Sequence, residues 1–321
     1  IFEGAIREVK EETNLNISQI EVFNVERRLR NKKMRLTELL NKDEVTISCE
    51  LFPPKQGAQL ENYKNIVKDM AALKPAYMSV TYGATGGTSD YTVKLAEEVR
   101  NNNIPALAHL TCASSTREKV ASVIEELKAA NIENILALRG DIPANADFPL
   151  PDQYKHASEL IADIKAQGDF CIGGACYPEG HPEAATIFED LDHLKEKVDA
   201  GCEFLTTQMF FDNNILYNFM YKALKKGIDV PIVAGIMPVT NASQIKRITS
   251  LSGNMVPPRF LAIVDRFGDN PAAMRQAGIA YATEQIIDLI ANGVNHVHIY
   301  TMNKPDVAGE ILDNLSNIYV R

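Results

Sequence analysis

The sequence predicts a single (β/α)8 barrel over residues 34–321, and two observations carry this prediction. Eight short apolar segments, each typical of a strand buried on both faces, alternate with helical patterns. Polar and ionisable residues follow nearly every one of these strands, at the end where such barrels place their active sites. A doubly wound open sheet is the alternative, but no G-x-G-x-x-G motif follows any strand.

The first expected strand ends at an unusual carboxylate, Glu50. The expected strands are Val45–Cys49, Tyr77–Thr81, Ala106–Leu110, Asn134–Leu138, Cys171–Ala175, Phe204–Gln208, Pro231–Ile236 and His296–Tyr300. Glu50 stands next to Leu51 and Phe52, and desolvation in such apolar surroundings favours the protonated acid. Glu50 is therefore a candidate general acid. The simpler interpretation is a strand-end glutamate that turns into solvent.

The segments between the strands repeat apolar residues at helical spacing. The expected helices are Leu60–Leu73, Tyr91–Asn101, Ser115–Ala130, Tyr154–Lys165, Thr186–Ala200 and Asn213–Lys225, with a short one over 35–40. Two capping boxes are expected, Ser115 with Glu118 and Thr186 with Glu189. The helical stretch 270–291 is longer than a barrel needs, so we expect an extra helix within it, before the last strand.

Charge and cysteine content exclude several classes of protein. The chain has 42 acidic and 33 basic residues, which argues against a nucleic-acid or anionic-membrane surface. The five cysteines are scattered and include no C-x-x-C pair, so we expect free thiols and no metal site. No apolar run reaches the roughly 18 residues of a membrane span, and no signal-peptide pattern is present. These features predict a cytoplasmic protein.

Residues 1–33 are expected to be an N-terminal extension outside the barrel. Within them Arg7–Leu15 is charged and resembles the second half of a Nudix box, but the first half is absent and Asn14 stands where glycine is usual. We interpret this segment as a fragment or fusion remnant without Nudix activity. A solvated amphipathic helix is the simpler alternative. Met34 fits a native start, because the short expected helix follows it directly.

Several strand-end residues have two interpretations. His109 is either a core histidine with hydrogen bonds or a functional group, and Arg139 with Asp141 forms either an ion pair or part of a pocket. Asp190 and Lys197 share a helical face, as a surface salt bridge or as a pair that binds a ligand. In the loop after the fifth strand, acidic residues and a histidine alternate around a proline, which argues against one shared metal ion. These residues are Glu179, His181 and Glu183.

The strand-end motifs, taken together, resemble one known family. In chain order they are Cys49–Pro54, Val80–Ala84, His109–Cys112, Leu138–Asp141, Tyr177–Ala184, Thr207–Asp212, Gly235–Val239 and His298–Asn303. This set resembles the bacterial 5,10-methylenetetrahydrofolate reductases over residues 34–321. The resemblance implies a (β/α)8 barrel with non-covalent FAD at the strand ends, NADH or NADPH as electron donor and a folate substrate. It also implies the short bacterial form, without the regulatory domain of the animal enzymes.

The resemblance further implies a ping-pong reaction that serves methionine synthesis. Glu50 would protonate N10 of the folate and open its five-membered ring, and hydride from FAD would then make the 5-methyl group. Asp141 would tune the flavin electrostatically. Folate-contacting positions would be Glu50, Gln208, Gln244 and Lys304. FAD-contacting positions would be Thr81, Tyr82, Ala84, His109, Arg139, Gly140, Asp141, His156, Ala157, Tyr177, His181, Ala184, Asp190, His193 and Lys197.

Four positions depart from the family pattern. His156 occupies a position where one branch of the family has tyrosine, and His193 a position where the family has asparagine. Glu196 and Lys304 each occupy a position where the family has arginine. These changes bear on FAD affinity, on recognition of the folate tail and on the electron donor. We expect a homo-oligomer, and some short family members need a partner subunit. The alternatives to a reductase are a non-flavin barrel lyase and a non-catalytic barrel subunit of a one-carbon complex.

Overall fold

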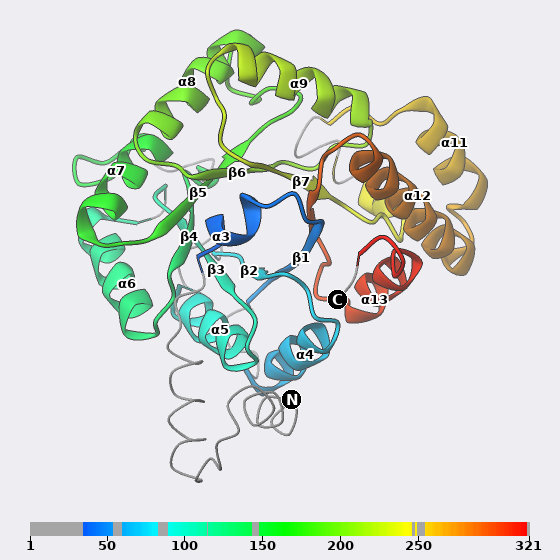
Figure 1. Cartoon of the computed structure of the whole chain (residues 1–321), viewed down its shortest axis with the longest axis horizontal. Coiled ribbons are helices and arrows are strands. Elements are labelled where there is room, and N and C mark those ends of the chain that lie inside the picture. Colours follow the sequence, from blue (N-terminus) through cyan, green and yellow to red (C-terminus); the bar gives the residue numbers. More distant parts are fainter. Residues whose placement is uncertain are drawn as a thin grey trace, which may run out of the picture. The chain divides into compact units, whose positions relative to one another are not determined.

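Eight parallel strands close into a barrel in sequence order, and the last strand pairs with the first (Figure 1). The computed structural model describes residues 35–53, 60–82, 89–113, 115–142, 148–245, 248 and 254–319. The strands are β1 (Thr46–Leu51), β2 (Met78–Val80), β3 (Ala106–Thr111), β4 (Asn134–Leu138), β5 (Cys171–Cys176), β6 (Phe204–Thr207), β7 (Ile232–Ile236) and β8 (His296–Ile299). The predicted fold class is confirmed. Residues 1–33, with the Nudix-like stretch, lie outside the described residues, so their assignment stays a prediction.

The helices surround the ring of strands except for the short α3 (Thr37–Leu40), which lies over one end of the ring (Figure 1). They are α3 (Thr37–Leu40), α4 (Leu60–Ala72), α5 (Ser89–Asn101), α6 (Arg117–Ala129), α7 (Ala157–Gln167), α8 (Ile187–Asp199), α9 (Asn213–Lys225), α11 (Pro258–Phe267), α12 (Pro271–Ala291) and α13 (Pro305–Asn314). Within the described part of the chain, none of them is long and apolar enough to cross a bilayer.

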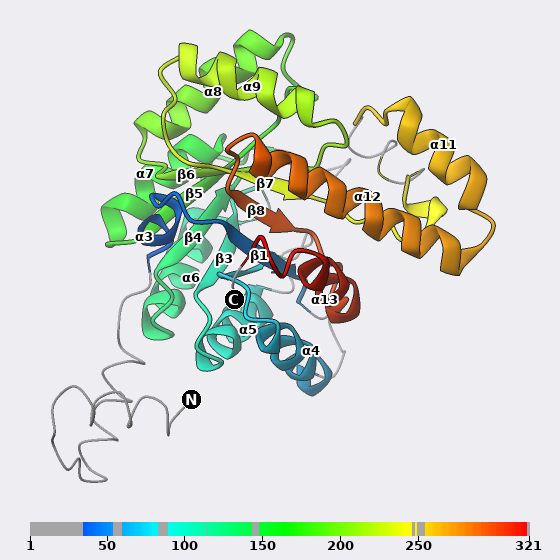
Figure 2. The ribbon, with the colours of Figure 1, turned by 45° about the vertical axis from the view of Figure 1, so that its right-hand side comes forward.

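The extra helix was predicted in the wrong place. The stretch 270–291 is one continuous helix, α12, whose first turn is capped by the Asn270 side chain accepting from the Ala273 N–H at 3.2 Å. The extra helix is α11, directly before it, which lies outside α12 and away from the strands (Figure 2). Phe260 of α11 packs on Phe211, with ring centroids 5.4 Å apart, and so joins α11 to the apolar cluster beyond β7.

The starts of α5, α6 and α7 also differ from the prediction, and α5 begins at Ser89 rather than at Tyr91. Thr116, rather than Ser115, caps α6 and accepts from the Lys119 N–H at 3.2 Å, so the first expected capping box is wrong. The start of α7 lies at Ala157 because His156 is extended, with φ −135° and ψ 157°.

The second capping box is half confirmed. Thr186 caps α8 by accepting from the Glu189 N–H at 3.2 Å. The Glu189 carboxylate, however, accepts from the N–H of Ala185 at 2.6 Å rather than from that of Thr186. The chain entering α8 is therefore held by contacts on both sides of Thr186.

Strand β1 runs through Glu50 to Leu51 instead of ending at Cys49, and all its residues are buried. Side chains alternate across a strand, and Ile47, Cys49 and Leu51 belong to the apolar cluster beneath the helices. Ser48 and Glu50 therefore face the barrel interior. Glu50 is only 6% exposed, so the interpretation that it turns into solvent is wrong.

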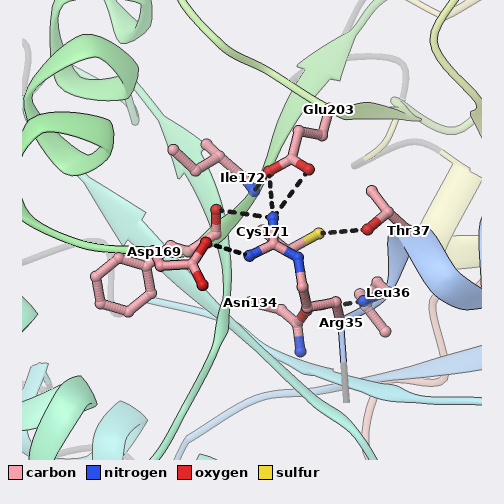
Figure 3. A network of polar contacts seen from close by, with 9 residues as sticks. Arg35, Leu36, Thr37, Asn134, Asp169, Cys171, Ile172 and Glu203 are labelled. Carbon is pink, nitrogen blue, oxygen red and sulfur yellow. Dashed lines mark hydrogen bonds and ion pairs between the residues drawn. The ribbon is translucent and has the colours of Figure 1, made fainter. Parts of the chain in front are cut away.

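The N-terminal end of the barrel is closed by the short helix α3 together with Arg35 and Leu36. Leu36 and Leu40 pack against side chains at the beginnings of the strands. Arg35 binds Asp169 at 2.8 Å and Glu203 at 3.0 Å, and these contacts fasten it to the chain before β5 and β6 (Figure 3). This end is thus filled and ion-paired, which leaves the opposite end of the barrel for a functional site.

Candidate active site

A cavity of about 670 Å³ lies at the C-terminal ends of β3, β4 and β5, against helices α7 and α8. Most of the predicted FAD positions line it together. These are Tyr82, Arg139, Gly140, Asp141, His156, Ala157, Tyr177, His181, Ala184, Asp190, His193 and Lys197. Thr81 and His109 are not among the lining residues, and Ala84 lies outside the described residues. Thr111 lines the cavity but was not predicted; it shares a strand face with His109, and that alternation could have indicated it.

Arg139 supplies a fixed positive charge to the cavity. Its guanidinium forms two hydrogen bonds of 2.6 Å with the Glu183 carboxylate, so the proposed pair with Asp141 is wrong. This bidentate contact lowers the pKa of Glu183. Asp141 is exposed and lines the same cavity, where its charge is one cause of the raised pKa of Tyr177, after burial.

Asp190 and Lys197 lie within the cavity wall, so the surface salt bridge is wrong. Asp190 is 7% exposed, and burial raises the pKa of its carboxyl. Burial also lowers the pKa of Lys197, whose ammonium donates to the carbonyl of Ala175 at 2.9 Å. A buried ammonium group with few partners favours an anionic ligand.

Two of the departures from the family pattern face each other across the cavity. His156 precedes α7 and His193 lies on α8, and their rings stack with centroids 6.4 Å apart at an interplanar angle of 22°. Glu196, the third departure, lines the same region. Three of the four departures are therefore gathered at one place, whereas Lys304 is not among the residues that line this cavity.

Glu50 holds its proton at neutral pH. Burial alone raises the pKa of its carboxyl from 4.5 to about 8, because water that would stabilise the charged form is excluded. The backbone carbonyl of Glu50 accepts from the Thr301 hydroxyl at 2.6 Å, which fixes the strand at this point. This confirms the direction of the shift that the sequence predicted for Glu50.

The interior layer beneath Glu50 is polar but uncharged. Burial lowers the pKa of His298 to about 3, so its ring is neutral. Ser48 donates to the Val297 carbonyl at 3.0 Å, and it therefore accepts from His298 Nδ1 at 2.7 Å. His298 Nε2 is then left to accept from the Ser79 hydroxyl at 2.9 Å. Because His298 is neutral, it provides no positive charge that would favour the ionised form of Glu50.

His109 faces the interior from β3 and is 8% exposed. Burial lowers its pKa to about 3, and Nε2 has no hydrogen-bond partner. The interpretation of His109 as a core histidine with satisfied hydrogen bonds therefore fails for this atom. A buried ring nitrogen without a partner is costly, and it marks a place where a ligand atom would be favourable.

The predicted folate positions lie apart from this cavity. Gln208 Oε1 accepts from the Met209 N–H at 3.0 Å, and Gln244 Oε1 accepts from the Thr240 N–H at 2.9 Å. A backbone N–H only donates, so these contacts fix both amide oxygens and leave both NH2 groups as donors for a ligand. Lys304 donates to the Thr240 hydroxyl at 3.1 Å, so Gln244 and Lys304 are brought together at Thr240.

The chain is similar to proteins of one known family. The family model for methylenetetrahydrofolate reductase matches residues 35–316. A protein of Zea mays named methylenetetrahydrofolate reductase (NADH) 1 is 36% identical over 298 residues, covering 88% of this chain and 50% of its own length. The 5,10-methylenetetrahydrofolate reductase of Pectobacterium carotovorum is 34% identical over 272 residues, covering 84% of this chain and 90% of its own. That of Escherichia coli is 33% identical, covering 85% and 91%.

A solved structure also shares the fold. It is described as an uncharacterized protein from Clostridium thermocellum that binds two copies of 5-methyl-5,6,7,8-tetrahydrofolic acid. The alignment covers 89% of this chain and 99% of that one, with a TM-score of 0.62 and 15% identity. The chain spans about half the length of the maize relative but nine-tenths of the bacterial ones. The family match and the extensive bacterial similarity show that this chain belongs to the methylenetetrahydrofolate reductase family.

Proposed function

We propose that this chain reduces 5,10-methylenetetrahydrofolate to 5-methyltetrahydrofolate, with FAD as bound cofactor and NADH or NADPH as electron donor. One observation carries the proposal: Glu50, inside the C-terminal half of the barrel, is a buried carboxyl with a pKa of about 8. Such a group can deliver a proton at neutral pH, as the ring opening of this folate requires. The name of the maize relative specifies NADH, which supports NADH as the donor.

The cavity beside the barrel mouth fits a flavin nucleotide. Its volume of about 670 Å³ lies within the range of pockets that bury a small ligand. Lys197 supplies positive charge for a diphosphate, to which Arg139 would add if the diphosphate took the place of Glu183, and the first turn of α7 adds backbone N–H groups at Ala157 and Ser158. Gly140 has φ +83°, and an added Cβ there would lie 3.0 Å from Thr111 Cβ, so this wall accepts no side chain.

The chain's own residues divide the remaining work. When bound, FAD would supply hydride transfer between the nicotinamide and the folate. Glu50 holds a proton and gives it to N10 of the folate. Asp141 adds negative charge to the cavity, and the NH2 groups of Gln208 and Gln244 donate to folate acceptors. Lys304 binds a carboxylate of the folate tail. Self-association and a partner subunit stay predictions.

The function is tested first by colour. The purified chain, supplied with FAD and freed of excess cofactor, should be yellow and should bleach when NADH is added under anaerobic conditions. Addition of 5,10-methylenetetrahydrofolate should then restore the colour and form 5-methyltetrahydrofolate, as detected by chromatography. A colourless chain that takes up no FAD would contradict the proposal and favour the non-flavin lyase or the non-catalytic subunit.

A pair of lysine substitutions locates the cofactor. Lys197→Met should weaken FAD binding by about one to two powers of ten, because it removes a buried charge at the proposed diphosphate site. Lys195→Met is the matched control on the same helix, since Lys195 does not line the cavity and forms an ion pair with Asp199 of the same helix. Equal FAD affinities in the two variants, measured by fluorescence titration, would show that the cofactor does not bind in this cavity.

A further inference from the structure

The loop between β5 and α8, residues 177–186, contacts two different parts of the barrel through two glutamates. Glu183 pairs with Arg139 after β4, on the side of the cavity. Glu179 faces the other side and accepts from the Met255 N–H at 2.8 Å and from Asn254 Nδ2 at 3.3 Å. Both acceptors of Glu179 are thus engaged by the segment before α11.

Asn254 extends the contact of Glu179 to the end of β6. Its side-chain NH2 carries two hydrogens and also donates to the carbonyl of Met209 at 2.8 Å. Met209 in turn donates its N–H to Gln208 Oε1 at 3.0 Å. The backbone carbonyl and the N–H of Met209 therefore each form a hydrogen bond with a side chain. The orientation of the Gln208 amide thus depends on a chain of contacts that begins at Glu179.

Burial makes the loss of these hydrogen bonds energetically costly. Asn254 is 7% exposed, so water does not readily replace a lost partner of its side chain. The acceptor is a carboxylate, which makes stronger hydrogen bonds than a neutral group. Glu179 itself is held in a turn in which the Gly180 N–H donates to the Tyr177 carbonyl at 3.0 Å. The rings of Tyr177 and His181 pack edge to face with their centroids 4.6 Å apart, and both residues line the cavity.

We infer that Glu179 is a positioning residue that orients the Gln208 amide for folate through Asn254 and the backbone of Met209. The inference rests on the proposed function and adds to it a link between the two halves of the site. The same short loop carries residues of the cofactor cavity and the carboxylate that holds the folate side. Glu179 acts only through these partners and does not contact the folate.

Replacement of Glu179 by glutamine tests the inference with little change in shape. Glu179→Gln places an NH2 group against Met255 N–H or Asn254 Nδ2, both donors, so one of the two contacts is lost. Binding of 5-methyltetrahydrofolate to the FAD-loaded chain, measured by calorimetry, should weaken about tenfold. Hydrogen exchange at Met209 and Met255 should become faster by a similar factor, while the FAD content and the rate of NADH oxidation with an artificial acceptor stay unchanged.

Further variants separate positioning from general damage. Asn254→Ala should weaken folate binding as well, and the double variant should bind no more weakly than Asn254→Ala alone, because both changes break one chain of contacts. Glu189→Gln is the matched control: its carboxylate accepts from the Ala185 N–H at 2.6 Å in the same loop, with no path to Gln208 among the described contacts. Its folate affinity should equal that of the parent.

The outcomes distinguish this inference from the proposed function. Parent-like folate affinity in Glu179→Gln would overturn the inference, whatever happens to the exchange rates. Additive effects of the two substitutions would overturn it as well. If the unsubstituted FAD-loaded chain binds no folate, the proposed function fails and the inference fails with it. Folate binding by the parent together with the expected loss in Glu179→Gln supports both.

Discussion

Glu50→Gln should lower the rate of the folate half-reaction by about three powers of ten. The rate of NADH oxidation with an artificial acceptor should stay within about twofold of that of the parent. Glutamine fills the same space but has no proton to give, and the buried Glu50 carboxyl is the group that holds one at neutral pH. Rapid mixing of the reduced chain with 5,10-methylenetetrahydrofolate measures the first step, and a steady-state assay with a dye measures the second.

A conservative variant and a control variant show whether the loss comes from the missing acid. Glu50→Asp keeps the acid but moves it back by one methylene, so it should retain part of the folate activity. Glu97→Gln makes the same chemical change at an exposed position of α5 and should leave both half-reactions intact. Equal loss of both half-reactions in Glu50→Gln would show that Glu50 supports the structure or the cofactor rather than the proton transfer.

Glu50→Gln should also stabilise the fold, in a way that depends on pH. The pKa of Glu50 is raised from 4.5 to about 8 by burial, so between these values the unfolded chain is ionised at this residue while the folded chain is not. The parent therefore loses stability relative to Glu50→Gln as pH rises through this window, and the difference levels off above about pH 8. At pH 7 the difference in the free energy of unfolding should be on the order of 3 kcal/mol.

Urea denaturation of parent and variant across this window measures the effect. The two free energies of unfolding should differ little at the acidic end and separate steadily toward neutral pH. Glu97→Gln, which changes an exposed carboxylate, should follow the parent throughout. Curves for Glu50→Gln and parent that stay parallel from pH 4.5 to 8 would mean that the Glu50 carboxyl is not desolvated in the folded chain.

The barrel was predictable because its signals are local. A buried parallel strand is a short apolar run and a surface helix repeats every 3.6 residues, so β4 at Asn134–Leu138 and α9 at Asn213–Lys225 match the prediction. The misplaced extra helix has a local cause as well. Pro257 and Pro258 suggest a break in a helix, but Pro258 occupies the first turn of α11, where the missing N–H costs nothing.

The site was predictable only in part, because its decisive contacts are not local. The apolar neighbours of Glu50 indicated the direction of its pKa shift, but they left open whether the side chain is buried or turns into solvent. The partner of Arg139 is Glu183, from a different loop, and no spacing rule selects it over the nearby Asp141. The orientation of the Gln208 amide depends on the backbone geometry at Met209, which residue type alone does not give.

The pH dependence of the folate half-reaction shows whether Glu50 is the proton donor. The unsubstituted chain, loaded with FAD and reduced, is mixed with 5,10-methylenetetrahydrofolate at a series of pH values, and the return of flavin absorbance gives the rate. If Glu50 supplies the proton, the rate is constant at low pH and falls about tenfold per unit above an apparent pKa near 8. A rate that does not change through pH 8, or the same pH dependence in Glu50→Gln, would show that Glu50 is not the proton donor.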